Sequence, residues 1–269
     1  MIDLHCHILP GIDDGARSLA EAAEMCRLAA AAGCEALVAT PHQRRLGWWN
    51  CDRAALAELR GRLQEAVGPA LRILLGGEIH VDGQLLSEIV DLAGDPTHGP
   101  LPLAGSRYLL LEFGPDAEPP FACDLVHELA VAGWRPILAH PEFIPWMAED
   151  LAVVARLVDL GAFVQVTAMS VTGDFSRRAQ DHTHRLIERG LAHFVASDAH
   201  DLKRRPPGLR RAWEVIAGRW GEEAARALLE AHPQAVIADL PLPAEPAAAA
   251  ERSAGRGGAS SCAGWQPRA

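Results

Sequence analysis

The stretch Ile2-Asp3-Leu4-His5-Cys6-His7, with Gly11-Ile12-Asp13-Asp14-Gly15 close behind it, decides how the rest of the chain is interpreted. Apolar and polar residues alternate in it with a period of two, which is typical of a β-strand whose two faces differ. On such a strand His5 and His7 leave the same face about 7 Å apart at the backbone, so both imidazoles can bind one metal ion. The stretch is therefore a candidate metal site, to be judged by the rest of the chain.

A second His-x-His pattern, His182-Thr183-His184, provides a contrast. It lies in a stretch with a helical pattern, where residues two apart point about 200° away from each other. We therefore expect no shared metal ion there.

Seven short apolar runs recur along the chain, and a helical pattern follows each of them. The first helical pattern starts at the capping box Ser18-Leu19-Ala20-Glu21 and stops at Gly33. The runs cover residues 2–7, 35–42, 71–75, 108–111, 135–140, 162–167 and 193–198. This alternation predicts βα units on a parallel sheet, and the number of runs favours a closed α/β barrel. An open, doubly wound sheet is the competing architecture.

Composition sets further bounds on the 269-residue chain. We expect one barrel domain over residues 1–240 and a disordered tail of Pro, Ala, Gly and Ser over residues 241–269. The net charge of −10 argues against a nucleic-acid partner, which requires clustered positive charge. No apolar stretch approaches the about 18 residues of a membrane span. Six cysteines without a C-x-x-C pair, and no room for a secretory signal, predict a cytoplasmic location.

Polar residues of the kinds that bind metals follow the predicted strands or lie in the first loop. They are His5, His7, Asp14, His42, Glu78, Glu112, His140, Asp198 and His200. The carboxyl ends of barrel strands form the rim on which active sites are built. Several carboxylates on one rim repel one another unless cations lie among them, so these residues predict a multi-metal centre.

The chain resembles the PHP (polymerase and histidinol phosphatase) superfamily, and within it the bacterial tyrosine-protein phosphatases that accompany capsule and exopolysaccharide tyrosine kinases. The resemblance runs from residue 2 to about residue 235. Its motifs are Asp3-x-His5-x-His7, Ile8-Leu9-Pro10-Gly11-Ile12-Asp13-Asp14-Gly15, Ala39-Thr40-Pro41-His42, Gly77-Glu78-Ile79, Leu111-Glu112-Phe113, Ala139-His140-Pro141-Glu142 and Ala196-Ser197-Asp198-Ala199-His200.

The resemblance implies a distorted seven-stranded (β/α)7 barrel that holds three divalent ions, usually Mn2+. By motif position, one ion is held by His5, His7, Glu78 and Asp198. Glu78 bridges to a second ion, which Glu112 and His140 also hold. Asp14, His42 and His200 hold the third.

The activity implied is hydrolysis of phosphotyrosine in proteins by a metal-bound hydroxide, without a covalent enzyme intermediate. Arg205 matches an arginine that grips the phosphate in the family, and Asp198 and His42 are expected to act with it in catalysis. The partner implied is a phosphotyrosine protein, such as an exopolysaccharide tyrosine kinase. At one position the chain departs from the family, because Phe143 stands where a second phosphate-binding arginine usually follows His-Pro-Glu.

Other interpretations remain open from the sequence. The same fold and metals could act on histidinol phosphate, on another small phosphomonoester or on a nucleic-acid end, although the acidic charge disfavours the last. A metal-bound regulatory module without turnover is the non-enzymatic alternative. Cys262 and Arg268 have the C-x5-R spacing of cysteine-based phosphatases, but they lie in the Pro/Gly/Ala tail, so we expect no role for them.

Overall fold

The computed structural model describes residues 1–90 and 97–243. The strands of these residues are β1 (Ile2–Cys6), β2 (Ala36–Ala39), β3 (His42–Gln43), β4 (Arg72–Leu75), β5 (Glu78–His80), β6 (Tyr108–Glu112), β7 (Arg135–Ala139), β8 (Phe163–Thr167) and β9 (Phe194–Ala196). The α-helices are α1 (Leu19–Ala31), α2 (Arg53–Val67), α3 (Leu85–Val90), α4 (Pro119–Val131), α5 (Pro145–Glu149), α6 (Leu151–Asp159), α7 (Ala168–Thr172), α8 (Arg177–Glu188), α9 (Arg210–Trp220), α10 (Glu222–Arg226) and α11 (His232–Ile237). Short 3-10 segments are η2 (Leu103–Gly105) and η3 (Pro141–Phe143), and η4 (Ala227–Ala231) is a π-helical turn.

The strands follow one another in chain order around a ring, and all of their pairings are parallel. One sheet has the order β1-β2-β4, and the other has the order β3-β5-β6-β7-β8-β9. The ring closes where a parallel bridge joins Cys6 to Ala199, just beyond β9. There His7 N–H donates to Ala199 O at 2.8 Å, and Asp198 N–H donates to His5 O at 2.8 Å. A doubly wound sheet reverses its strand order at a switch point, which this arrangement lacks in the described residues, so the closed barrel is the observed architecture.

The predicted number of seven strands is not confirmed, because the described residues form nine. The difference arises where Thr40 and Pro41 separate β2 from β3, and Gly76 and Gly77 separate β4 from β5. Proline has no N–H to donate to a sheet, and glycine weakens a strand. As a result Glu78 begins a strand of its own instead of following one.

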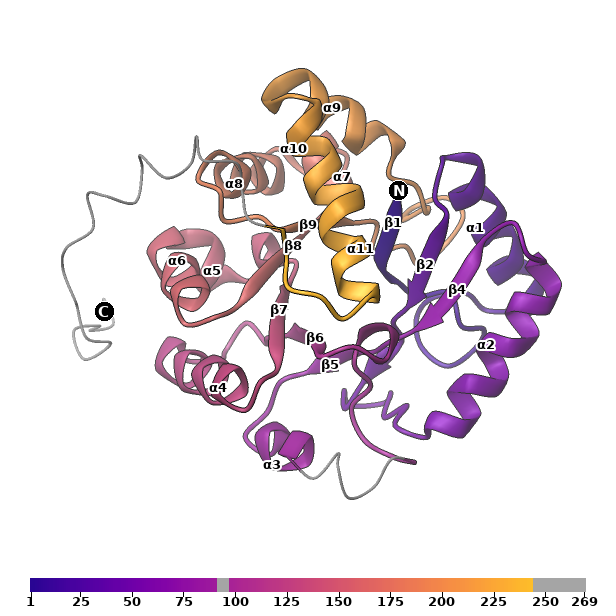
Figure 1. The fold of residues 1–269 in the computed structure, drawn as a ribbon, viewed down its shortest axis with the longest axis horizontal. Helices are drawn as coiled ribbons and strands as arrows, with labels where there is room; N and C mark the ends of the chain where they lie inside the picture. The colour runs from indigo at the N-terminus through magenta and orange to yellow at the C-terminus, as the bar shows by residue number, and fades with distance from the viewer. Residues whose placement is uncertain (91–96, 244–269) are drawn as a thin grey trace.

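Alternate residues of the strands divide between two hydrophobic clusters. In β6, Tyr108 and Leu110 join a smaller cluster that also draws on β1, β2, β7 and β9, so it fills the inside of the ring. Leu109 and Leu111 join the larger cluster between the strands and the helices. Val236 of α11 belongs to the inner cluster, and Figure 1 shows α11 lying in front of the strands.

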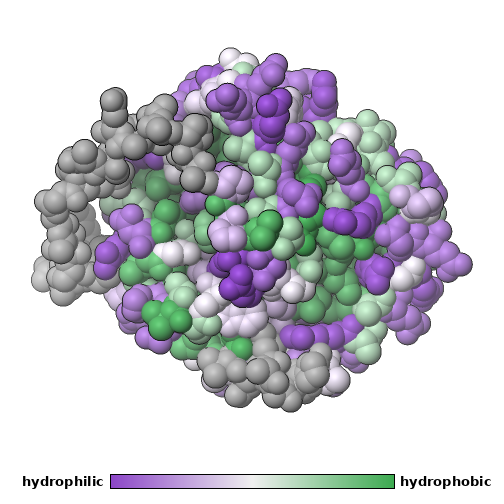
Figure 2. Space-filling view, in the orientation of Figure 1, coloured by the Kyte–Doolittle hydropathy of each residue, from purple (hydrophilic) through white to green (hydrophobic). Residues whose placement is uncertain are grey.

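The helices surround the strands as the βα pattern predicts (Figure 1). The predicted start of the first helix is confirmed, because the Ser18 side chain accepts a hydrogen bond from Glu21 N–H at 3.2 Å. Figure 2 shows hydrophilic residues gathered over the outer helices, with hydrophobic residues nearer the middle of the same face. No helix in residues 1–90 and 97–243 combines the length and the apolar character needed to cross a bilayer.

The last described residues still contact the barrel. The Tyr108 hydroxyl donates to Leu240 O at 2.8 Å, and Leu242 packs against the inner cluster. The first three residues of the predicted tail, 241–243, are therefore described by the structure. The rest of the predicted tail, residues 244–269, lies outside the described residues. Cys262 and Arg268 also lie outside the described residues.

Candidate metal centre

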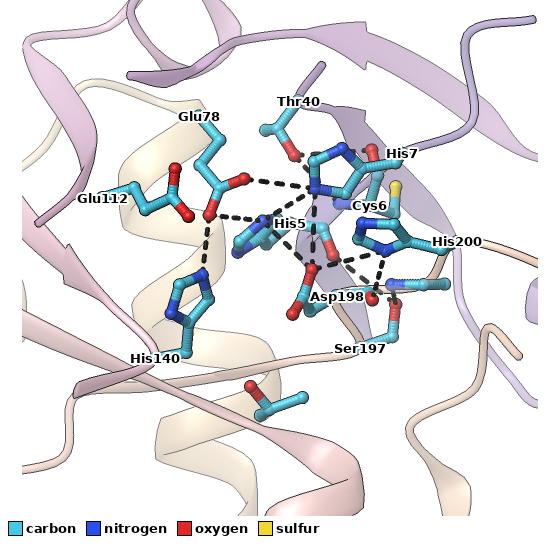
Figure 3. A network of polar contacts seen from close by, with 12 residues as sticks. His5, Cys6, His7, Thr40, Glu78, Glu112, His140, Ser197, Asp198 and His200 are labelled. Atoms are coloured by element: carbon cyan, nitrogen blue, oxygen red, sulfur yellow. Dashed lines mark hydrogen bonds and ion pairs between the residues drawn. The ribbon is translucent and has the colours of Figure 1, made fainter. Parts of the chain in front are cut away.

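All nine predicted ligands come together at one end of the barrel: seven lie near or beyond the carboxyl ends of β1, β6, β7 and β9, and His42 and Glu78 begin β3 and β5. Figure 3 shows side chains from different strands and from the loops that follow them, among them His5, His7, Glu78 and Asp198, pointing toward a common centre. His5, His42, Glu78 and Glu112 belong to β1, β3, β5 and β6. The others lie in the loops after β1 (His7, Asp14), β7 (His140) and β9 (Asp198, His200).

Two of these side chains are aimed by unusual backbone at the end of a strand. His140 follows β7 with a φ of 33°, and Asp198 follows β9 with a φ of 52°. Non-glycine residues seldom adopt this left-handed region, and such strain collects at functional sites. Gly15 is required for a different reason, because a Cβ there would lie 2.1 Å from His7 O. The loop that carries Asp14 is thereby packed directly on the backbone of His7.

Glu78 lies at the middle of the cluster, and its carboxylate contacts four imidazoles. Oε1 lies 2.7 Å from His140 Nε2 and 3.4 Å from His5 Nε2. Oε2 lies 2.8 Å from His42 Nδ1 and 3.3 Å from His7 Nε2. The Glu78 side chain is only 1% exposed. Each oxygen of this buried carboxylate therefore lies between two imidazoles, so the two oxygens could bind two different cations.

Asp198 is the second buried carboxylate of the centre, and it forms an ion pair with Arg205. Its Oδ1 lies 3.4 Å from His5 Nε2 and 3.5 Å from His7 Nε2. Arg205 donates from Nη2 to Asp198 Oδ2. The structure thus brings Arg205 to the edge of the cluster, with its side chain partly exposed.

A third group lies toward solvent. Asp14 Oδ1 is 3.3 Å from His42 Nε2 and 3.3 Å from His200 Nε2, and its side chain is 43% exposed. In this group the potential ligand atoms of His7, Asp14, His42 and His200 all lie within 4.8 Å of one another.

Three further groups meet the same spacing. They are His5, His140 and Asp198; His5, His7 and Glu78; and His42, Glu78 and Glu112. The groups share members, so neighbouring ions would share ligands. The geometry places His140 with Asp198 as well as beside Glu78, whereas the family resemblance implied Glu78 and Glu112 as its companions. In the described residues no such group contains His182 or His184, which lie on α8 as predicted.

The close contacts between imidazoles and carboxylates shift the pKa values of both kinds of group in the cluster. Burial alone would lower the pKa of His42, but hydrogen bonds to Asp14 and Glu78 outweigh it and raise the pKa to about 9. Burial likewise opposes the charge on His140, yet Glu78 raises its pKa to about 9. Burial would raise the pKa of Glu78, but the imidazoles around it hold that pKa well below its usual range. Without ions, protons on imidazoles therefore balance the carboxylates, and a bound cation must displace them.

The residues present fit a divalent metal. Imidazoles and carboxylates are the ligands that manganese, iron and zinc share. Two buried ligand-type atoms of the cluster, Glu112 Oε2 and His140 Nδ1, make no hydrogen bond, whereas Glu78 Oε2 and His42 Nδ1 lie 2.8 Å apart and have each other as ion-pair partners. Unpaired buried polar atoms are costly, and coordination would satisfy those that face the centre.

Two residues with no predicted role orient the histidines. Asp13 Oδ2 lies 3.0 Å from His7 Nδ1, and Gln165 Oε1 lies 2.9 Å from His5 Nδ1. Such partners fix the ring so that the other nitrogen faces the metal. The available signals were weak: Asp13 adjoins Asp14 in the first loop, and Gln165 is a polar residue inside an apolar strand.

Phe143 lies beside the centre but outside it. Its ring centre is 5.9 Å from that of His140 and 5.0 Å from that of Phe175, which it meets edge to face. Arg205 Cζ in turn lies 5.9 Å from the Phe175 ring. Phe143, Phe175 and Arg205 therefore form a row along one edge of the cluster.

Comparison with known proteins gives consistent relatives. A family model described as capsular polysaccharide synthesis, CpsB/CapC, matches residues 1–238. The tyrosine-protein phosphatase YwqE of Bacillus subtilis is 36% identical over 233 residues, covering 86% of this chain and 89% of that protein. The tyrosine-protein phosphatase CpsB of Streptococcus pneumoniae is 28% identical over 247 residues, covering 89% and 99%.

Solved structures agree with these relatives. A chain described under "Crystal structures of YwqE from Bacillus subtilis and CpsB from Streptococcus pneumoniae, unique metal-dependent tyrosine phosphatases" superposes with a TM-score of 0.83 at 34% identity. It covers 90% of this chain and 96% of its own. The phosphotriesterase homology protein of Escherichia coli, with a TM-score of 0.56 at 11% identity and coverage of 88% and 97%, shares the fold.

Proposed function

The chain belongs to the CpsB/CapC family of capsular polysaccharide synthesis, and from this premise we propose that it is a metal-dependent phosphatase of phosphotyrosine in proteins. The predicted family resemblance is confirmed. The observation that carries the proposal is the carboxylate of Glu78 among four imidazoles, next to Asp198 with its attached Arg205.

The proposed metal ligands are the nine residues of the centre, and the proposed native metal is manganese. We assign up to three ions, with Glu78 as a bridging ligand, because the four ligand groups overlap in their members. Asp14, His42 and His200, joined by His7, form the most exposed group. When bound, the ions would acidify a coordinated water and neutralise charge on the phosphoryl oxygens.

The chain's own residues would hold the reacting groups in place. Asp13 and Gln165 fix the rings of His7 and His5 through their Nδ1 atoms. Arg205 is partly exposed at the edge of the centre, and its planar fork suits two phosphoryl oxygens. A phenolate with an ordinary pKa of about 10 leaves without much help from a general acid, which agrees with a site made mainly of metal ligands.

The substrate and its setting are proposed from the family. A phosphorylated tyrosine kinase of capsule or exopolysaccharide synthesis is the proposed partner. A cytoplasmic location is supported by five free cysteines, Cys6, Cys26, Cys34, Cys51 and Cys123, because thiols stay reduced there.

The deciding experiment compares substrates on purified protein of known metal content. Hydrolysis is measured for a phosphotyrosine peptide, the matched phosphoserine peptide and histidinol phosphate, with manganese present. We expect the phosphotyrosine peptide to have the highest kcat/KM. A preference for histidinol phosphate would indicate that the centre hydrolyses a small phosphomonoester instead. No turnover of any of the three substrates by fully metal-loaded protein would favour a regulatory module.

A further inference from the structure

Arg45 is an arginine at the metal centre that has no assigned role. Its Nη1 lies 3.1 Å from Glu112 Oε1 and 3.1 Å from His42 Nε2. Both partners belong to the nine ligands, yet the Arg45 side chain is 40% exposed. The guanidinium therefore lies between the centre and solvent, where an incoming substrate would meet it.

The backbone around Arg45 forms a tight turn that presents this side chain. Arg45 N–H donates to Trp48 O at 3.2 Å, and Trp48 N–H donates to Arg45 O at 2.8 Å. The Trp48 ring stacks on His42 with 5.2 Å between centres and 11° between planes. Arg45 Cζ lies 5.6 Å from the Trp48 ring centre. Trp48 thus holds the arginine against the centre by a cation–π contact.

The adjacent Arg44 differs from Arg45 in its burial and in its ion-pair partners. Its side chain is fully buried, and Nη2 lies 2.8 Å from Asp82 and 3.0 Å from Glu88. Arg45 uses only Nη1 in the described part of the chain. Its Nη2 and Nε remain available to a phosphoryl group.

A phosphoryl group on this centre lacks one expected contact. Phe143 has no hydrogen-bond donor at the position where the family usually has an arginine, so Arg205 is the only predicted guanidinium. Arg205 donates a hydrogen bond to Asp198, whereas Arg45 donates one to Glu112. Figure 3 shows Glu112 and Asp198 on either side of His5, so the carboxylates that bind the two arginines lie on different sides of that ring.

We propose that Arg45 is a second phosphate-binding residue, which grips the phosphoryl group of the substrate together with Arg205 and takes over the contact that Phe143 cannot make. The inference rests on the proposed function. It makes Arg45 a catalytic residue in the sense that it contacts the substrate, with Trp48 as its positioning residue.

The test is the binding of inorganic phosphate to manganese-loaded protein, measured by calorimetry for the parent and for Arg45→Met. We expect the Kd for phosphate to rise about ten- to a hundredfold, the loss of a charge-assisted hydrogen bond. Metal content should stay at the parent level, and KM for a phosphotyrosine peptide should rise more than kcat falls. Arg45→Lys, which keeps the charge but not the fork, should lie between the two.

Arg27→Met is the matched control, because Arg27 forms an exposed ion pair with Glu24 on α1 at 2.7 Å. It should leave the Kd for phosphate unchanged. An unchanged Kd in Arg45→Met, or a loss of metal in that variant, would overturn the proposal, since Arg45 would then be inert or would only support the ligands. If the parent hydrolyses no phosphotyrosine but Arg45→Met still weakens phosphate binding, the proposed function fails while the role of Arg45 stands.

Discussion

His140 Nε2 lies 2.7 Å from Glu78 Oε1, although 62 positions separate the two residues in the chain. Glu78 begins β5 and His140 follows β7, and these two strands are not neighbours, since β6 lies between them. The contact therefore exists because the barrel curves, which brings the ends of its strands toward one axis. Glu78 contacts four of the imidazoles of the cluster.

Replacing Glu78 should be the most damaging change in the centre. We expect Glu78→Gln to lose bound manganese and to lower kcat more than about a hundredfold. Mutations of residues that only orient a metal ligand already cost up to about a hundredfold in activity, and a direct ligand should cost more. His42→Ala should be less severe, because His42 is not proposed to bridge. Metal analysis and kinetics measure both effects. Glu214→Gln is the control, because Glu214 forms an exposed ion pair with Arg210. Normal metal content in Glu78→Gln would show that Glu78 is not a metal ligand.

Activity should depend on metal and not on a cysteine nucleophile. Chelation is expected to abolish hydrolysis of the phosphotyrosine peptide, and added manganese should restore it, because the ions supply the activated water. Cys262→Ser should keep the parent kcat/KM. An inactive Cys262→Ser enzyme would instead support the cysteine mechanism.

The stability of the metal-free protein should fall as the solution becomes alkaline. The pKa values of His42 and His140 are raised to about 9, above an ordinary value of about 6.5. Their protonated forms therefore stabilise the fold fully below about pH 6.5, and this contribution is lost as the pH rises through about 9. We expect Tm to drop by on the order of 10 °C between pH 6.5 and pH 9.

Thermal unfolding with chelator at pH 6.5, 8 and 9.5 measures this loss. With manganese bound the drop should disappear, because ions then replace the protons. A metal-free Tm that is flat across this range would show that the imidazoles are neutral in the folded chain.

Phe143 should favour aromatic substrates. It is 42% exposed and stands in a row with Phe175 and Arg205, so a substrate ring can pack on it. We expect Phe143→Arg to lower KM for alkyl phosphates about tenfold through a new charge-assisted contact, and to help aryl phosphates less because the ring contact is lost. KM measured on both substrate classes tests this. No change on either class would mean that residue 143 does not face the phosphate.

The chain should tolerate removal of residues 244–269. Their composition is poor in large apolar residues, so they contribute little to a core. A variant ending at Pro243 is expected to keep the parent Tm and kcat. A variant ending at Ile237 should be less stable, because it loses Leu242 from the inner cluster and the Leu240 carbonyl that Tyr108 contacts. A large fall in Tm for the longer variant would contradict the predicted tail.

Much of the barrel could be predicted because its signals are local. The alternation at Ile2 to His7, the capping box at Ser18 and the stop at Gly33 act within a few residues, and each has its expected place in the structure. The ligand residues follow from the same logic, since parallel strands in chain order carry their carboxyl ends to one rim. Residue identity and strand position were enough to indicate which side chains would meet.

The tertiary structure decided how they meet. Register and barrel closure divide the predicted strand 35–42 into β2 and β3 and add β5, which was not predicted. They also bring Glu78 into contact with four imidazoles and Arg205 into contact with Asp198. The left-handed turns at His140 and Asp198 aim side chains in directions that no spacing rule specifies. Asp13, Gln165 and Arg45 join the centre from segments with no motif of their own, because a hydrogen bond depends on ångström-scale placement between parts of the chain far apart in sequence.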